Sequence, residues 1–475
     1  MRFEAVIGLE IHAQLKTNSK IFCGCKPVFG DEPNTHGCPV CLGLPGSLPV
    51  LNRRVVRMAI KAGRAVNCSI ARKSIFARKN YFYPDLPKGY QISQYDMPLC
   101  ENGHLTVTVD GKKKRIGITR IHLEEDAGKL IHDQDIDSLF DVNRCGTPLV
   151  EIVSEPDMRT PQEAYAYLTA LKQILEYLDI SDCNMEEGSL RCDANVSIRP
   201  QGQTTLGTKT ELKNMNSFRG VEKALEYEIM RQTEVVQSGG AVIQQTFLWD
   251  ANKNRTVAMR TKEHAHDYRY FPDPDLVALI VEDSWVTDIE RDMPELPQAR
   301  LERFRSQYGL NEEHAAVLVD SRALADYFEK AVEASAGEVK VTANWVMSTV
   351  LRLSKDSKTT VDRLQLTPDR LAAVIKLFKE GTISDSAAKK VMLAVEEQGK
   401  EPCEIVDALG LRQISDTGEL EKIVDDLLTK HPDEAERLKG GEKKLTGFFV
   451  GQAMKATQGK GNPREISKLL AQKLG

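Results

Sequence analysis

The chain has 475 residues, of which 41% are hydrophobic and 28% are charged, and its formal net charge is -5. This length exceeds one ordinary core and predicts about two to four domains, and the composition is typical of a globular protein. No window approaches the ~20 consecutive apolar residues that a membrane-spanning helix needs. Because the sequence runs from Met1 almost directly into a strand, we expect no signal or transit segment and predict a cytoplasmic location.

The first predicted strand, Val6-Ile-Gly-Leu-Glu-Ile-His12, alternates between apolar and polar residues. Its odd-numbered positions are apolar and share one face, whereas Glu10 and His12 share the other. A carboxylate and an imidazole two positions apart can ligate a hard cation or its bound water. A surface glutamate beside a hydrogen-bonded histidine is the alternative that this strand alone leaves open.

Four of the ten cysteines follow in a tight group. Cys23 and Cys25 form a C-x-C pair, and Cys38 and Cys41 form a C-x-x-C pair twelve residues later. This spacing, with glycine and proline turns around it, is typical of tetrahedral zinc, and free thiols are the alternative. Four protein ligands leave no open coordination position, so the zinc would be structural. It would hold the loop 23–41, which has too few apolar residues to fold alone.

The segment Arg78–Asp85 mixes cations with aromatic residues. Lys79 could bind phosphates, and Tyr81 or Tyr83 could stack on a base or a ribose. An exposed aromatic loop that packs on a neighbouring domain is an equally good interpretation.

An acidic run closes the strand predicted from residue 115, in the stretch His122-Leu-Glu-Glu-Asp-Ala-Gly-Lys129. With a period of two, Glu125 shares a face with the apolar residues of the strand, and Glu124 shares the other face with His122. Three adjacent carboxylates are electrostatically costly unless a cation lies among them. Alone, the run could also be a solvated turn.

Three later strands repeat an isolated carboxylate among apolar neighbours. The carboxylates are Glu151 in 147–153, Asp193 in 189–198 and Glu211, which lies between two lysines in 209–213. Their convergence would suit magnesium, which usually accompanies nucleotide phosphates. Since no P-loop or dinucleotide-binding glycine motif occurs, a nucleotide would bind in a β-rich cradle. Arg269, in the segment 267–275, is a further cation of the same region.

The predicted fold class is α+β multidomain, with a β-rich N-terminal cradle followed by all-α helical and tail domains. We place the cradle at 1–292, the helical domain at 293–405 and the tail at 406–475. Only two helices are predicted in the cradle. One starts at Pro161 after the N-cap Thr160, with Glu163 completing a capping box, and the other covers about 217–238.

The tail carries an excess of positive charge after residue 441, with seven basic residues against two acidic ones. Such a balance fits contacts to nucleic-acid phosphates. The cations that we single out are Lys443, Lys444, Lys455, Lys460 and Arg464.

Taken together, these segments closely resemble the B subunits of bacterial aspartyl/glutamyl-tRNA(Asn/Gln) amidotransferases. The likeness covers the whole chain, and its longest motifs are 6–12, 78–84, 122–129, 146–156, 185–193, 267–272 and 447–452.

The resemblance implies a cradle that binds ATP and magnesium and phosphorylates the side-chain carboxylate of Glu on tRNA(Gln), or of Asp on tRNA(Asn). Ammonia then displaces the phosphate. Around the metal and phosphates it implies Glu10, His12, Glu125, Glu151, Asp193 and Glu211, with Glu10, His12, Glu125 and Glu151 as magnesium ligands. ATP or its phosphates would contact Lys79, Tyr81, Tyr83 and Arg269, of which Lys79 is the predicted phosphate clamp.

The resemblance also implies partners: a glutaminase A subunit that supplies ammonia, a small C subunit completing a heterotrimer, and mischarged tRNA bound in part by the basic tail. Two other functions are conceivable. A zinc-containing RNA-binding module would have no reason to direct several carboxylates into one cradle, where they repel phosphate. A stand-alone ATP-dependent ligase would need an ammonia-producing site of its own, and the sequence shows no such motif.

Overall fold

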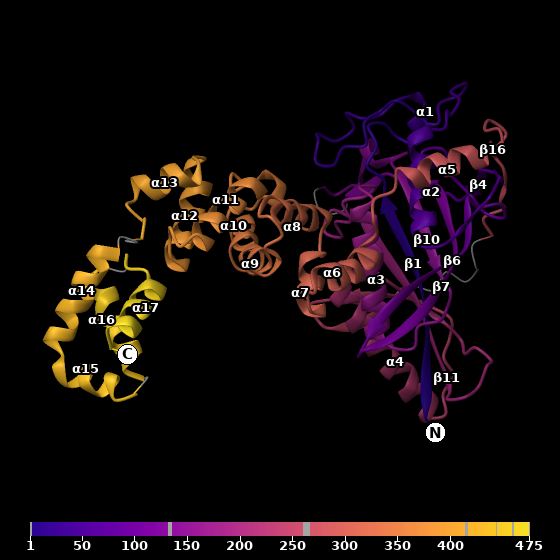
Figure 1. Ribbon diagram of the computed structural model, residues 1–475. Helices are drawn as coiled ribbons and strands as arrows, with labels where there is room; N and C mark the ends of the chain where they lie inside the picture. The colour runs from indigo at the N-terminus through magenta and orange to yellow at the C-terminus, as the bar shows by residue number, and fades with distance from the viewer. Residues whose placement is uncertain are drawn as a thin grey trace. The chain divides into compact units, whose positions relative to one another are not determined.

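The computed structural model describes residues 2–131, 135–259, 267–413, 417–442, 444–457 and 460–474. The chain divides into two compact units, Met1–Leu296 and Pro297–Gly475 (Figure 1). The first unit contains the sheets, and the second is built of helices. This organisation confirms the predicted α+β multidomain class. The finer division at 292 and 405 stays a prediction.

A nine-stranded sheet organises the first unit, in the order β14-β13-β12-β11-β1-β10-β7-β6-β2. Strands β12 and β13 pair in parallel, and all other neighbours pair antiparallel. The strands are β1 (Phe3–Gln14), β2 (Ser69–Ile70), β6 (Cys100–Val109), β7 (Lys112–Glu125), β10 (Pro148–Ser154), β11 (Leu190–Pro200), β12 (Thr210–Lys213), β13 (Thr246–Asp250) and β14 (Arg255–Ala258).

Three small sheets accompany the large one, in the orders β15-β4-β5, β16-β3 and β8-β9. Their strands are β3 (Lys73–Ser74), β4 (Ala77–Asn80), β5 (Tyr90–Ser93), β8 (Lys129–Ile131), β9 (Leu139–Asp141), β15 (Phe271–Pro272) and β16 (Leu279–Ile280). Strand β5 lies against β7, so the small sheet that contains the aromatic segment borders the large sheet.

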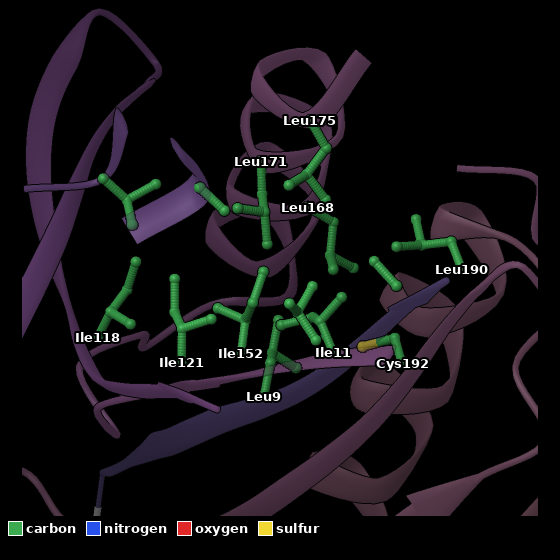
Figure 2. Packing of buried hydrophobic residues seen from close by; sticks show 14 of the residues in the cluster. Leu9, Ile11, Ile118, Ile121, Ile152, Leu168, Leu171, Leu175, Leu190 and Cys192 are labelled. Atoms are coloured by element: carbon green, nitrogen blue, oxygen red, sulfur yellow. The ribbon is translucent and has the colours of Figure 1, made fainter. Parts of the chain in front are cut away.

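One face of the large sheet is apolar and forms the main core with helices of the first unit. The odd-numbered positions of β1 from Ala5 to Ala13 are buried, as the alternation predicted. Figure 2 shows side chains of one helix directed at this face. The residues labelled there are Leu168, Leu171 and Leu175 of that helix and Leu9, Ile11, Ile118, Ile121, Ile152, Leu190 and Cys192 of the sheet.

The helices of the first unit are α1 (Pro39–Leu42), α2 (Arg53–Ala65), α3 (Pro161–Tyr177), α4 (Phe218–Gln237) and α5 (Asp283–Arg291). The prediction of only two helices in this region was therefore wrong. Helix α2 was missed because its first turn holds two arginines and no acidic residue, which is unfavourable to the helix dipole. Its apolar face nevertheless buries Val55, Met58 and Ile60.

The two predicted helix starts are confirmed, with one correction. Thr160 accepts a hydrogen bond from the backbone N of Glu163, and Ser217 caps α4 in the same way. The carboxylate of Glu163 does not return to the N-cap residue as in a capping box. Its Oε2 accepts instead from the backbone N of Arg159, the residue before the N-cap, at 2.6 Å and from Lys114 Nζ at 2.7 Å.

The second unit contains two hydrophobic clusters, one from Phe304 to Val406 and one from Leu420 to Leu470. A π-helical turn, Val346–Val350, lies between α9 and α10. Ser384 caps α12 after Gly381, which has a positive φ of 71°. The helices are α6 (Pro297–Tyr308), α7 (Glu312–Leu318), α8 (Arg322–Ala334), α9 (Val339–Trp345), α10 (Leu351–Asp356), α11 (Pro368–Lys379), α12 (Asp385–Gln398), α13 (Pro402–Ala408), α14 (Thr417–Lys430), α15 (Pro432–Lys439), α16 (Lys444–Ala456) and α17 (Pro463–Leu474).

Across the described parts of the chain, every helix is too short or too polar to traverse a lipid bilayer.

Candidate functional site

The polar face of the large sheet collects side chains from four adjacent strands. In β1 this face carries the even-numbered residues, including Glu10 and His12. The strand register places His12 opposite Arg191 of β11 on one side and opposite Glu151 of β10 on the other. Glu151 in turn is opposite His122 of β7. A row of three basic groups and one acidic group, in the order Arg191, His12, Glu151 and His122, therefore crosses the middle of the sheet.

A group of metal-ligand type is centred on this row. His12, Glu124 and Glu151 each offer a ligand atom, and these atoms lie within 4.8 Å of one another. His12 Nε2 is 3.2 Å from Glu151 Oε2 and 3.5 Å from Glu124 Oε1. One imidazole and two carboxylates suit a divalent cation that keeps several water or phosphate ligands. We call these three residues the His12 group.

A second histidine, His122, lies against the His12 group. It is buried, and its Nε2 is 3.4 Å from Glu151 Oε2. Burial alone would lower the pKa of His122, but Glu151 and Glu124 outweigh it and raise that pKa to about 9. Burial would likewise raise the pKa of Glu151, yet the two histidines hold it well below its ordinary value. The two histidines therefore favour the ionised form of the Glu151 carboxylate.

Glu125, predicted as a magnesium ligand, is not part of the His12 group. Its buried carboxylate accepts a hydrogen bond from the backbone N of Ile92 at 2.8 Å and forms an ion pair with Lys88. The adjacent Glu124 belongs to the group instead, and its Oε2 accepts a hydrogen bond from Ser93 Oγ at 3.3 Å. Alternation along β7 had already put Glu124 on the face of His122, and this was the signal available in the sequence.

Asp126, considered in the sequence only as part of the acidic run, is buried beside the site and accepts hydrogen bonds from two side chains of the polar face. Its Oδ2 accepts from Arg191 at 2.9 Å and from Gln14 Nε2 at 3.0 Å. Arg144 Nε lies 3.7 Å from its Oδ1. Asp126 therefore fixes the guanidinium of Arg191, the residue opposite His12.

The remaining predicted carboxylates form a second group next to the first. Glu10 accepts from Asn195 Nδ2 at 3.0 Å, and Lys213 Nζ lies 2.5 Å from Asp193 and 2.9 Å from Glu211. Burial and the charges of Glu151 and Glu211 raise the pKa of Glu10. The structure thus brings Glu10, Asp193 and Glu211 to the same sheet face around one lysine, outside the His12 group.

The aromatic segment lies in the small sheet that borders β7. Lys79 Nζ is 4.8 Å from the centre of the Tyr268 ring, and Tyr81 packs edge-on against the same ring. Tyr83 is half exposed. Arg269 is largely exposed, has a positive φ of 45° and lies 3.5 Å from Asp267. The structure therefore brings Lys79 and Tyr81 together and leaves Tyr83 and Arg269 at the surface.

The four clustered cysteines converge as their spacing predicted. The Sγ atoms of Cys23, Cys25, Cys38 and Cys41 lie within 4.8 Å of one another. The contact with Cys23 and the charge of Lys20 lower the pKa of Cys41, against the effect of burial. Four thiol groups at this separation fit a tetrahedral metal ion, and the buried Lys20, with Nζ 3.5 Å from Cys41 Sγ, would offset part of the thiolate charge.

The basic residues of the tail are at the surface wherever the structure describes them. Lys444, Lys455, Lys460 and Arg464 are exposed, and none has an ion-pair partner within the described ranges. Lys443 lies outside the described residues.

Comparisons with known proteins agree over the whole chain. The model for the GatB/GatE catalytic domain matches residues 5–287, and the model for the GatB domain matches residues 326–474. The B subunit of the aspartyl/glutamyl-tRNA(Asn/Gln) amidotransferase from Thermoanaerobacter sp. (strain X514) is 56% identical over 475 residues, which is 100% of both chains. The B subunits of the same name from Syntrophotalea carbinolica and Geobacter sulfurreducens are each 55% identical, covering 100% of this chain and 99% and 100% of theirs.

Proposed function

The chain belongs to the GatB family of tRNA amidotransferase B subunits, and from this we propose that its polar sheet face activates and amidates an aminoacyl side chain on tRNA. The substrates are Glu-tRNA(Gln) or Asp-tRNA(Asn), ATP and ammonia. The observation that supports this assignment most directly is the convergence of His12, Glu124 and Glu151 within 4.8 Å. Because mischarged tRNA is an intermediate of translation, we place the reaction in the cytoplasm.

The proposed reaction has two steps. A side-chain carboxylate oxygen of the aminoacyl group attacks the γ-phosphorus of ATP, and ADP leaves. Ammonia then attacks the carbonyl carbon of the acyl phosphate, and inorganic phosphate leaves in place of oxide, which is a very poor leaving group. A divalent cation, for which we propose Mg²⁺, would neutralise phosphate oxygens as the phosphoryl group moves.

We propose that the residues on the sheet have different roles according to their charges. His12, Glu124 and Glu151 would hold the cation, and Arg191, fixed by Asp126, would face the phosphates as a cation that cannot lose its proton. Glu10, Asp193 and Glu211 would surround the reacting groups from the neighbouring rows, and Glu125 remains a proposed site residue through its ion pair with Lys88. For ATP we propose contacts with Lys79, Tyr81, Tyr83 and Arg269.

The other proposed components follow from the chemistry. Ammonia would come from a glutaminase A subunit, with a small C subunit completing a heterotrimer. A structural Zn²⁺ would sit among the four cysteines. Lys443, Lys444, Lys455, Lys460 and Arg464 of the tail domain, 406–475, would contact tRNA phosphates without reading sequence. The cradle 1–292 and the helical domain 293–405 complete the proposed organisation.

The test measures ATP hydrolysis and Gln-tRNA formation by the complex purified with its A and C partners. Glu-tRNA(Gln), uncharged tRNA and no RNA are compared, with ammonium chloride as the nitrogen donor. We expect turnover only with charged tRNA, and hydroxylamine in place of ammonium should trap the acyl phosphate as a hydroxamate. Glu124→Gln should abolish product, while Glu101→Gln, an exposed carboxylate on β6, should not. ATP turnover that ignores both the charging state of the tRNA and Glu124 would refute the proposal.

A further inference from the structure

A short turn that carries two of the clustered cysteines is in direct contact with Lys88. Helix α1 contains Cys41, and Gly43 ends the helix in the left-handed conformation, with a φ of 65°. A Cβ at Gly43 would lie 2.3 Å from Cγ, 3.1 Å from Cβ and 3.2 Å from Cα of Lys88. Only glycine therefore lets the backbone approach the stem of this lysine so closely. We call residues 38–43 the cysteine turn.

Lys88 is a buried cation whose stem and ammonium group have different neighbours. Its stem lies against Gly43, and its ammonium group forms an ion pair with Glu125. The side chains are only 8% and 4% exposed, respectively. A buried carboxylate that loses its cationic partner is strongly destabilised. The position of the Lys88 stem therefore matters for Glu125, although Gly43 does not touch that carboxylate group itself.

The loop that carries Lys88 contacts the cysteine region at a second point. The carbonyl oxygen of Asp85 accepts hydrogen bonds from Cys145 Sγ at 3.8 Å and from the backbone N of Gly128 at 2.8 Å. Cys145 is buried and belongs to the same hydrophobic cluster as Cys41. The loop between β4 and β5 is thus held against the residues around the cysteines at both Asp85 and Lys88.

A third contact approaches Glu125 from the cysteines through Lys20. This lysine is fully buried, donates to the carbonyl oxygen of His36 at 2.7 Å and has its Nζ 3.5 Å from Cys41 Sγ. A Cβ at Gly146 would lie 3.5 Å from Lys20 Cδ and 4.0 Å from Glu125 Oε2. The stem of Lys20 and the carboxylate of Glu125 are therefore neighbours of the same glycine.

The order of the cysteine turn depends on its thiol groups more than on apolar packing. In the segment 23–43, all of which the structure describes, Cys41 is the only buried residue. In a loop with so little apolar burial, binding of a metal ion supplies the free energy that fixes the backbone. Loss of the metal ion should consequently release Gly43 from the stem of Lys88.

We propose that the cysteine turn, fixed by the metal ion that the four cysteines hold, positions Lys88 against Glu125. The inference rests on the proposed function, in which this ion pair belongs to the site. Glu125 ends β7 and directly follows Glu124 of the His12 group, so a displaced Lys88 would disturb the strand end that carries the group. Gly43 is in this sense a positioning residue, because it acts through Lys88.

The first measurement follows Lys88 itself in the full-length chain. Acylation of lysines by a small N-hydroxysuccinimide ester is quantified by mass spectrometry before zinc removal with a chelator, after removal, and after zinc is restored. We expect removal to accelerate acylation of Lys88 at least about tenfold and restoration to reverse the change, because the amine reacts only after local opening. Lys213, on β12 of the same sheet, should not change. Unchanged acylation of Lys88 in zinc-free protein would overturn the inference.

Gly43→Ala tests the contact while all four cysteines remain. Its matched control is Gly46→Ala, since Gly46 also has a positive φ, of 83°, but an added Cβ there would meet no described atom within 4 Å. We expect both variants to fold and retain zinc, and Gly43→Ala alone to accelerate acylation of Lys88 about tenfold. No acceleration, or an equal one in both variants, would contradict the proposal. If zinc removal also exposes Lys213, this pair of variants decides.

Turnover by the complex with its A and C partners distinguishes positioning from general stability. Gly43→Ala should lower kcat for Gln-tRNA formation at least about fivefold, and Gly46→Ala should leave it unchanged. In a Lys88→Ala background, Gly43→Ala should cause no further loss, because the side chain through which it acts is absent. Additive losses would overturn the inference, and a Lys88→Ala complex without turnover leaves the decision to the acylation of Lys88. Because acylation is measured without substrates, failure of the proposed chemistry would be seen separately, in the wild-type and Glu124→Gln assays.

Discussion

Replacing Asp126 by asparagine should destabilise the first unit substantially. The Asp126 carboxylate is buried and accepts from Arg191 at 2.9 Å, from Gln14 at 3.0 Å and from the backbone N of Ala127 at 3.0 Å. The substituted amide would keep the shape but remove the charge that two arginines face. Breaking a fully buried ion pair costs about 3–5 kcal/mol, and since Arg191 and Arg144 are each 35% exposed we expect about 2–4 kcal/mol.

The loss is measured by urea unfolding of the full chain in a Trp345→Phe background. The two remaining tryptophans, Trp249 and Trp285, both lie in the first unit, so their fluorescence reports its transition separately from that of the helical unit. A matched control is Asp179→Asn, an exposed carboxylate paired with Lys16, for which the expected change is below about 0.5 kcal/mol.

A decrease of less than about 1 kcal/mol for Asp126→Asn, with the control unchanged, would refute the reasoning. It would mean that water replaces the carboxylate at both guanidinium groups. The pair Asp126→Asn and Arg191→Gln should also be less destabilising together than the sum of the single changes, because each single change leaves the other partner without its counter-charge.

Three further predictions concern the other sites. Purified protein should contain about one zinc ion per chain, Cys38→Ser should lose it, and the exposed Cys403→Ser should retain it, as measured by elemental analysis. Lys79→Ala should weaken ATP binding about tenfold, whereas Lys73→Ala, at an exposed position on β3, should leave it unchanged. Equal ATP affinities of the two variants would exclude the phosphate-clamp role of Lys79. Burial would raise the pKa of Glu329, but the ion pairs with Arg300 and Arg303 outweigh burial and lower that pKa. The ion pairs therefore stabilise the fold above the ordinary carboxyl pKa of 4.5, and this stabilisation is lost as the pH falls through the lowered pKa. Glu329→Gln should cost about 1–2 kcal/mol at pH 7 and progressively less in acid, measured by urea unfolding with Trp345 as the sole tryptophan after Trp249→Phe and Trp285→Phe.

The strands and their faces could be predicted from the sequence because alternation is a local property. In β11, alternation puts Leu190, Cys192, Ala194, Val196 and Ile198 on the face opposite Asp193, and all five are buried. The partners across the sheet could not be predicted in this way. Nothing in the sequence around His12 indicates that Glu151 is its neighbour, because that contact depends on the register of strands almost 140 residues apart.

Family resemblance and strand alternation favoured different neighbouring glutamates, Glu125 and Glu124, for the metal-ligand group. Resemblance implied Glu125, whereas alternation grouped Glu124 with His122, and the described geometry puts Glu124 in the His12 group. Helix α2 could not be predicted from local signals, because its first turn is unfavourable for a helix. The helix is stabilised by the burial of its apolar face in the core. Asp126 could be recognised in the sequence only as part of an acidic run, because its role depends on arginines from two distant segments.

That acidic run can be tolerated because the fold gives each of its three carboxylates a different cationic partner. Glu124 faces the histidines of β1 and β7, Glu125 pairs with Lys88 of the aromatic segment's loop, and Asp126 holds the arginines at 144 and 191. Without these partners, three adjacent buried carboxylates would strongly oppose folding. The strand end at 124–126 can therefore be buried only when β1, β11 and the loop before β5 are all in place. Assembly of the charged face therefore depends on the same long-range strand pairings that build the large sheet.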